Sequence, residues 1–393
     1  MTILEVRTAS LPKGYKNGTH RLTTPDETLA RVEPHVETML VTRCADVTGL
    51  DRLGIPVFCA IRPKGEILQL ANGKGPTPGN AKVSALMEAL EHYHAENPDS
   101  NLRRTSYLAL RRDGHAALQP ASLPLYDTAT YFSPAYVLDW VMARNIMDEE
   151  EMWLPACAAY IRPPMLFTLS TNGLASGNHF VEATLHGLYE VIERDAISRL
   201  FVDGRLRLTR TNCKVIDPGT ICDSDVHSLV VKLQRAQIKL VLIWIESCIA
   251  MNTFWAILLD QNPTSYATVI HFGSGAHLSH SVAAIRAITE AAQARLTYIH
   301  GARENVVGKI QSPSIELIKR VYSFFDQLEC DRDWQCLHDL ADEDLAQDYH
   351  FILTSLRVAG YRQAYRVDMT RAPFNIPVIK IFVPGLQIRS GLF

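Results

Sequence analysis

The sequence lacks the hallmarks of several protein classes. Its eight cysteines include no Cys-x-x-Cys pair, and Cys330, Cys336 and His338 have no second pair of ligands, so neither a zinc site nor a disulfide framework is expected. The 39 Lys and Arg against 42 Asp and Glu give no basic excess for coating nucleic acid. No apolar run approaches a transmembrane helix, and no hydrophobic signal segment precedes Arg21. We therefore expect a cytoplasmic protein that binds neither nucleic acid nor membrane.

The common glycine-rich phosphate loops are also missing. A Walker loop needs Gly-x-x-x-x-Gly-Lys followed by Ser or Thr, whereas residues 72–75 (Asn-Gly-Lys-Gly) lack the first glycine and the hydroxyl. Residues 273–277 (Gly-Ser-Gly-Ala-His) are a weak phosphate motif, and we expect them to form a flexible turn before a helix. Any ATP must therefore be held in another way.

The patterns that are present indicate an α+β protein. A hydrophobic fraction of 47% and a charged fraction of 21% allow a large buried core. Helical patterns cover residues 25–39, 81–96, 180–202, 281–298 and 342–358. Strand-like segments cover residues 55–61, 67–70, 238–245, 254–259, 266–272, 364–368 and 378–383, with a loop expected over 71–80. No internal repeat or low-complexity linker is evident, so we expect one domain with mixed or antiparallel sheets packed against long helices.

The first long helix places acidic side chains on one face. Ser84, Glu88 and Glu91 are separated by four and three residues, which aligns them along one stripe of a helix. A solvated acidic face explains this pattern equally well, and from this helix alone it is the preferred interpretation.

The second long helix favours a different interpretation. Glu182 and Glu193 fall on nearly the same side of an ideal helix, with Glu190 beside them, while apolar residues occupy the opposite arc. Like charges held together are unfavourable unless something positive joins them. Magnesium prefers oxygen ligands of this type.

The third long helix adds a cation and an amide to the pattern. Arg286, Glu290 and Gln293 share one face by the same spacing. Alone, Arg286 and Glu290 could form a surface ion pair worth less than about 1 kcal/mol. Three such helices in one chain point to a shared site.

Three blocks of the sequence resemble the signatures of the YcaO family. The first joins Gly73-Lys74-Gly75 to the run from Ser84 to Glu91. The second runs from Ser170 to Asn178 and continues from Glu182 to Asp195. The third joins Gly275-Ala276-His277 to the run from Arg286 to Arg295. The resemblance extends from about residue 20 to 386 and implies a YcaO-type ATP-binding domain.

The resemblance implies a site for ATP and Mg²⁺ built from separate helices. Its magnesium ligands would be Glu88, Glu91, Glu182, Glu190, Glu193 and Glu290. Its nucleotide contacts would be Arg21, Thr28, Ser84, His92, Asn178, Arg194 and Gln293, where His92 stands at a position that is often Arg in the family. On this basis residues 1–60 would be an N-terminal segment that contributes to the nucleotide site. Residues 61–393 would be the catalytic domain, with 300–360 as a helical excursion.

The family chemistry is activation of a peptide backbone amide. Phosphorylation of the amide oxygen by ATP makes the carbon electrophilic and the oxygen a leaving group. Arg194 and Arg286 would stabilise the charge that develops on the phosphoryl oxygens. A nucleophile then replaces the oxygen, so the expected substrate is a peptide or protein.

The identity of the nucleophile separates the branches of the family. Azoline-forming members typically end in Pro-x-Pro-x-Pro, whereas this sequence ends with residues 387–393 (Gln-Ile-Arg-Ser-Gly-Leu-Phe). The run from Leu11 to Arg21 and residues 48–51 resemble the branch encoded with a TfuA partner. We therefore favour thioamide formation with external sulfide and a TfuA-like partner, and a homodimer is a common assembly in the family. The alternatives are an azoline-forming cyclodehydratase, a nucleotide-binding scaffold without catalysis, and an accessory factor for methylthiolation.

Overall fold

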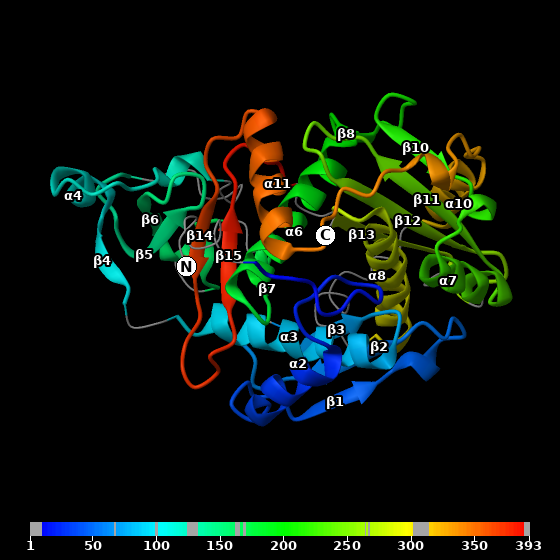
Figure 1. Ribbon diagram of the computed structural model, residues 1–393, viewed down its shortest axis with the longest axis horizontal. Helices are drawn as coiled ribbons and strands as arrows, with labels where there is room; N and C mark the ends of the chain where they lie inside the picture. Colours follow the sequence, from blue (N-terminus) through cyan, green and yellow to red (C-terminus); the bar gives the residue numbers. More distant parts are fainter. Residues whose placement is uncertain are drawn as a thin grey trace.

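In its described residues the computed structural model contains three larger antiparallel sheets and one two-stranded ribbon, joined by long helices (Figure 1), which confirms the expected α+β class. The structure describes residues 10–66, 68–98, 101–123, 133–161, 166–167, 170–263, 265, 268–301 and 314–388. Residue 67 of the strand predicted at 67–70, residues 266–267 of the strand predicted at 266–272, and residues 389–393 of the C-terminal run lie outside this set. Within the described part of the chain, none of the helices combines the length and apolar composition needed to span a bilayer.

The first sheet contains the predicted hairpin, with its second strand displaced along the chain. Its strands, in the order β1-β2-β3, are β1 (Arg43–Asp46), β2 (Val57–Ile61) and β3 (Leu70–Lys74). Ile61 lies opposite Leu70, as a hairpin requires. The loop predicted at 71–80 is wrong, because residues 71–74 pair with β2 and the next helix begins at Pro78.

The second and third sheets are larger than the first. The second has the order β10 (Cys213–Ile216), β11 (Ile238–Ile245), β12 (Asn252–Asp260), β13 (Ile270–His277). The third has the order β4 (Arg103–Ser106), β5 (Val137–Asn145), β14 (Tyr365–Asp368), β15 (Val378–Phe382), β7 (Leu174–Ser176), and β6 (Glu151–Pro155) pairs with β5. A small ribbon joins β8 (Phe201–Val202) to β9 (Arg205–Leu206). The strands β3, β13 and β7 each lie at an edge of their sheet.

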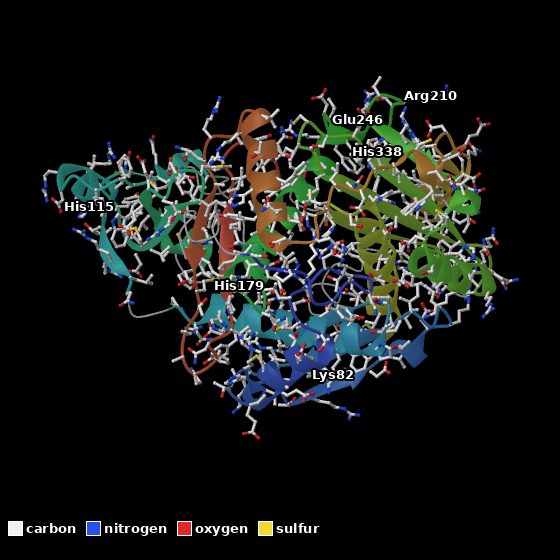
Figure 2. All side chains as sticks on the ribbon, in the orientation of Figure 1. Lys82, His115, His179, Arg210, Glu246 and His338 are labelled. Atoms are coloured by element: carbon white, nitrogen blue, oxygen red, sulfur yellow. The ribbon has the colours of Figure 1, made fainter. Side chains whose placement is uncertain are left out.

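Three long helices, which the sequence predicted, follow these three edge strands, of which β7 was not predicted. They are α3 (Pro78–Glu96), α6 (Phe180–Arg199) and α8 (His280–His300). Each begins after an N-cap residue, respectively Thr77, His179 and Ser279. Figure 2 shows His179 near the middle of the molecule and Lys82 of α3 toward its lower edge.

The shorter helices surround this frame. They are α2 (Pro25–Val32), α4 (Tyr107–Arg112), α5 (Ala156–Ala159), α7 (Ser224–Arg235), α10 (Ile315–Asp326) and α11 (Leu345–Val358). The helix predicted at 25–39 ends early, at Val32, and continues as one 3₁₀ turn, Glu33–His35. Pro34 explains the early end because it has no N–H and its ring clashes with the carbonyl of the preceding turn. The helix predicted at 342–358 is confirmed by α11.

Glycines allow the long helices to approach their strands closely. A Cβ atom on Gly73 of β3 would lie 2.1 Å from the carbonyl oxygen of Ala81 in α3. A Cβ atom on Gly275 of β13 would lie 2.2 Å from the carbonyl oxygen of Ala283 in α8. The flexible turn predicted at 273–277 is therefore wrong: these residues are strand, and their glycines serve helix packing.

The three strand–helix units are copies of one pattern. Their N-caps are about 100 residues apart, and each is followed at the same separation by an alanine and then by a glutamate. The alanines are Ala81, Ala183 and Ala283, and the glutamates are Glu88, Glu190 and Glu290. One turn further on are Glu91, Glu193 and Gln293. The expectation that the chain has no internal repeat is therefore corrected.

The three units pack in a closed ring. Besides its own strand, α3 contacts β7 of the second unit, α6 contacts β13 of the third, and α8 contacts β3 of the first. Figure 1 shows the three helices around the middle of the molecule. Each helix buries its apolar side in a different core cluster: Leu86 and Leu90 in one, Leu188 and Ile192 in another, Ile285 and Ile288 in the third. The polar sides of the helices are thereby available for a common site.

Candidate active site

The ring of helices is joined by polar contacts between neighbouring units. The Oγ of Ser176, at the end of β7, donates to Glu91 of α3 at 2.6 Å. The Oγ of Ser274 in β13 donates to Glu193 of α6 at 2.6 Å. The Nε2 of Gln293 in α8 donates to the backbone oxygen of Asn72 in β3 at 3.0 Å. Glu91, Glu193 and Gln293 occupy the same position of the repeat, and each contacts the next unit. The three units therefore form a closed ring.

Arg194 lies among the carboxylates of the second and third units. Its guanidinium is 3.9 Å from an oxygen of Glu190 and 3.8 Å from an oxygen of Glu193. The charges of Glu290, Glu193 and Glu190 also raise the pKa of Arg194, although burial opposes this. The half-buried guanidinium of Arg194 therefore balances carboxylates from two helices.

Glu290 of α8 has a second cationic partner. Lys74 Nζ lies 2.7 Å from its Oε2, and the Ser274 Oγ lies 3.3 Å from its Oε1. Burial alone would raise the pKa of Glu290, but the charges of Lys74 and Arg194 outweigh burial and lower it to about 2. This carboxylate is ionised at neutral pH.

The carboxylates of the first two units are less fully compensated by cations. Burial raises the pKa of Glu91 to about 8, and the charges of Glu88 and Glu190 add to the effect. Burial also raises the pKa of Glu190, which Arg194 opposes and Glu193 reinforces. The Oε2 of Glu193 is buried and accepts no hydrogen bond from any described residue. These groups would gain from an additional cation.

Glu182 belongs to a separate cluster near the N-terminal segment. Its Oε1 accepts the backbone N–H of Asn178 at 2.9 Å, and its Oε2 accepts the backbone N–H of Leu22 at 2.9 Å. Arg21 Nη1 is 3.9 Å from its Oε1. The side-chain amide of Asn178 donates to the buried Thr28 hydroxyl at 2.9 Å. The structure thus brings the predicted residues Arg21, Thr28, Asn178 and Glu182 together.

The remaining predicted residues lie on the long helices. Glu88 is partly exposed, and His92 Nε2 lies 3.7 Å from its Oε1 one turn later on α3. Ser84 is half-buried one turn before Glu88. Arg286 lies at the position of α8 that corresponds to Ser84, and its Nε is buried with no hydrogen-bond acceptor among the described residues.

Four polar residues of the site were missed by sequence reasoning. Lys74 and Ser274 lie on edge strands beside Glu290, and Ser176 holds Glu91. Buried Lys380 of β15 donates to the backbone oxygen of Ser170 at 2.6 Å. Burial lowers the pKa of Lys380 to about 8, although the charge of Glu190 opposes this. The internal repeat was an available signal for Lys74 and Ser176, because each lies three residues before the N-cap of its helix; Ser274 and Lys380 do not share this position.

The carboxylate oxygens of the candidate site are ligands of the kind that Mg²⁺ binds. Magnesium binds carboxylate oxygens and keeps several waters or phosphate oxygens in its shell. The unpartnered Oε2 of Glu193 and the raised pKa of Glu91 are the marks of carboxylates that lack a cation. Within the described part of the chain, no three acidic, His or Cys side chains surround one point as ligands, and Arg194 and Lys74 are paired with glutamates of the site. Metal binding would therefore require these two cations to move.

Comparison with known proteins identifies a family. A family model described as a YcaO cyclodehydratase that binds ATP and Mg²⁺ matches residues 72–387. The match includes all three long helices and most of the candidate site.

Relatives of similar length are found in archaea and bacteria. An uncharacterised protein of Methanothermobacter thermautotrophicus is 36% identical over 378 residues, which cover 93% of this chain and 94% of that protein. An uncharacterised protein of Mycobacterium tuberculosis is 36% identical over 393 residues, covering 96% and 84%. A protein named for the region 3′ of tfuA in Rhizobium leguminosarum bv. trifolii is 30% identical over 386 residues, covering 94% and 89%.

Solved structures share the fold. YcaO from Methanopyrus kandleri bound with AMPPCP and Mg²⁺ has a TM-score of 0.77 at 22% identity, covering 96% of this chain and 95% of its own. A heterocyclase in complex with substrate and cofactor has a TM-score of 0.80 at 21% identity, covering 97% of this chain and 54% of its own. The arrangement of sheets and helices described above is therefore one that known proteins also adopt.

Proposed function

Because the chain belongs to the YcaO family, an ATP- and Mg²⁺-dependent class of peptide-modifying enzymes, we propose that it converts a peptide backbone amide into a thioamide. The observation that carries the proposal is the ring of three strand–helix units. It brings five carboxylates and Arg194 close enough for their charges to act on one another. Such a concentration of carboxylates favours divalent cations and, through them, a triphosphate.

The residues that would hold Mg²⁺ are Glu88, Glu91, Glu190, Glu193 and Glu290, with Glu182 approaching from the N-terminal cluster. When bound, ATP supplies the phosphoryl group for the amide oxygen and Mg²⁺ neutralises the charge on the phosphate oxygens. Asn178, Thr28 and Arg21 would bind and orient the nucleotide from the side of the N-terminal segment.

Arg194 has a second role in this proposal. In the structure it neutralises Glu190 and Glu193. When cations take over these carboxylates, the guanidinium is released to contact the transferred phosphoryl group, where a fixed positive charge stabilises the transition state. Arg286 would act in the same way from α8.

Two observations favour sulfide over a substrate side chain as the nucleophile. The N-terminal run from Leu11 to Arg21 resembles the TfuA-associated branch. A relative 30% identical to the chain takes its name from the region next to tfuA. A TfuA-like protein would be the partner that delivers sulfide.

The test is a reconstitution with ATP, Mg²⁺, sulfide, the TfuA-like protein encoded beside this one and candidate peptides. Mass spectrometry of the peptide should show exchange of one oxygen for sulfur, dependent on ATP. Loss of one water from the peptide would instead support azoline formation. Nucleotide binding without peptide-stimulated hydrolysis would support a scaffold, and either result would overturn the proposal.

A further inference from the structure

Lys380 is a buried cation in the middle of the third sheet. It lies on β15, which pairs with β14 on one side and with β7 on the other, and only 3% of the residue is exposed. Val378 and Phe382, which share its face of the strand, pack in the apolar cluster around α3. A lysine is rarely buried in such surroundings, because its ammonium group loses its hydration. The function proposed above gives Lys380 no role.

The ammonium group of Lys380 has more donors than the described residues accept. Nζ carries three N–H groups. One of them donates to the backbone oxygen of Ser170 at 2.6 Å, and the ring of Phe382 lies 5.9 Å from Nζ. Among the described residues, no other acceptor bonds to Nζ and no carboxylate forms an ion pair with it. Two N–H groups of a buried cation can therefore donate to a ligand.

The charge of Lys380 acts on the carboxylates of the candidate site. Burial raises the pKa of Glu190 in α6, and the charge of Lys380 is among those that oppose this rise. Burial lowers the pKa of Lys380 to about 8, although the charge of Glu190 opposes the effect, so the lysine is mostly protonated at pH 7. The helix α6 packs against β15. Lys380 is thus a cation beside the site that is paired to none of its described carboxylates.

Two other cations of the site are already engaged. Lys74 pairs with Glu290 at 2.7 Å, and Arg194 lies 3.8 Å from an oxygen of Glu193. Both would have to leave their carboxylates before they could contact a phosphate. Lys380 can accept an anionic partner without breaking an ion pair.

The class of ligand follows from the charges around Lys380. A cation with two open N–H groups suits an anion with several oxygen acceptors. The nearby charge of Glu190 repels a bare anion. A phosphoryl group that arrives with Mg²⁺ meets this requirement, because the metal ion binds both carboxylate and phosphate oxygens.

We propose that Lys380 is a further catalytic residue, which donates hydrogen bonds to the phosphoryl group that passes from ATP to the substrate amide. The inference rests on the proposed function and adds to it a cation from the third sheet. The hydrogen bond to Ser170 holds Nζ in place before the nucleotide binds. A positive charge fixed in this way stabilises the transition state without reorganisation.

The chemical step requires no proton from Lys380. The bond from the γ-phosphorus to the bridging oxygen breaks, ADP takes the electron pair, and the amide oxygen forms the new P–O bond. After the nucleophile has added to the carbon, the C–O bond breaks and phosphate takes the electron pair. Lys380 keeps its proton and donates to the phosphoryl oxygens before and after both bond changes. No oxidant or reductant is needed.

The first test compares the binding of ATP and ADP to Lys380→Met, with Mg²⁺ and without peptide. ADP lacks the phosphoryl group that Lys380 would contact. Loss of a charge-assisted hydrogen bond should raise the Kd for ATP about tenfold, while the Kd for ADP stays within about twofold of the native value. Calorimetry measures both constants. Equal changes for the two nucleotides, or no change, would overturn the inference.

Two further variants separate this contact from an effect on folding. Lys380→Gln removes the charge but keeps an N–H donor for the oxygen of Ser170, and it should show the same selective loss of ATP affinity. The matched control is Lys239→Met on β11, because Lys239 also donates from a strand to a backbone oxygen, that of Asp326 at 2.7 Å. It should leave both Kd values unchanged. A selective loss of ATP affinity in Lys239→Met as well would contradict a specific role for Lys380.

The second test is ATP turnover stimulated by a peptide. The kcat for ADP release should fall about 100-fold in Lys380→Met, because a fixed charge on the transferred phosphoryl group is lost. Thioamide and azoline formation both pass through the phosphorylated amide, so the result does not depend on the nucleophile. Unchanged turnover would overturn the catalytic role. A native protein that loses its preference for ATP on Lys380→Met but turns over no ATP with any peptide would instead place the failure in the proposed function.

Discussion

Replacing Glu193 with Gln is expected to lower ATP turnover by about 100-fold or more, because the variant loses a charged ligand at the centre of the ring. Glu193 is buried on α6, and its Oε2 has no hydrogen-bond partner among the described residues. Removing its charge relieves repulsion with Glu190, so the variant should fold at least as well as the native protein. The loss should therefore appear in function and not in stability.

Thermal unfolding distinguishes a loss of ligand binding from a loss of stability. The native protein should gain stability from ATP with Mg²⁺, whereas Glu193→Gln should unfold at the same temperature with and without the ligands. Glu246→Gln is the control, because Glu246 is exposed at the upper edge of the molecule (Figure 2). A full ligand-induced shift in Glu193→Gln would show that this carboxylate holds no metal.

Replacing Gly275 with Ala is expected to lower the free energy of unfolding by about 3 kcal/mol. The new Cβ atom would lie 2.2 Å from the carbonyl oxygen of Ala283 and 2.5 Å from the backbone nitrogen of Ala287. The backbone of α8 would have to move away from β13. Because Ser274 holds both Glu193 and Glu290, the displacement should also weaken ATP binding.

Chemical denaturation measures this effect against a glycine in open space. A Cβ atom on Gly49 would meet no described atom within 4 Å, so Gly49→Ala should change the free energy of unfolding by less than about 0.5 kcal/mol. Equal stability of the two variants would mean that α8 does not lie as close to β13 as described.

The sequence predicted the long helices well because each has a continuous apolar side and no internal proline. Prediction of secondary structure from the sequence failed where tertiary packing overrides the local preference of the residues. Residues 273–277 read as a turn because of their glycines, yet Gly273 and Gly275 are needed where α8 crosses β13. Residues 71–74 have little strand character and are held in β3 by pairing with β2.

The candidate site was likewise predicted from the sequence only in part. Spacing within one helix identified the glutamates, because residues three or four apart share a face. Their partners could not be found in this way, since Lys74 meets Glu290 and Ser176 meets Glu91 across large separations in sequence. The repeat that relates these positions is faint, because little more than the caps, an alanine and a glutamate recur.

The central claim is that the three strand–helix units close around Mg²⁺ and the triphosphate of ATP. Its most direct test is a crystal structure with a non-hydrolysable ATP analogue and Mn²⁺ in place of Mg²⁺, with the metal located by anomalous scattering. We expect metal peaks among Glu88, Glu190, Glu193 and Glu290, with Arg194 and Lys74 moved onto phosphate oxygens. Metal and nucleotide bound elsewhere, with both cations still paired to the glutamates, would contradict the account.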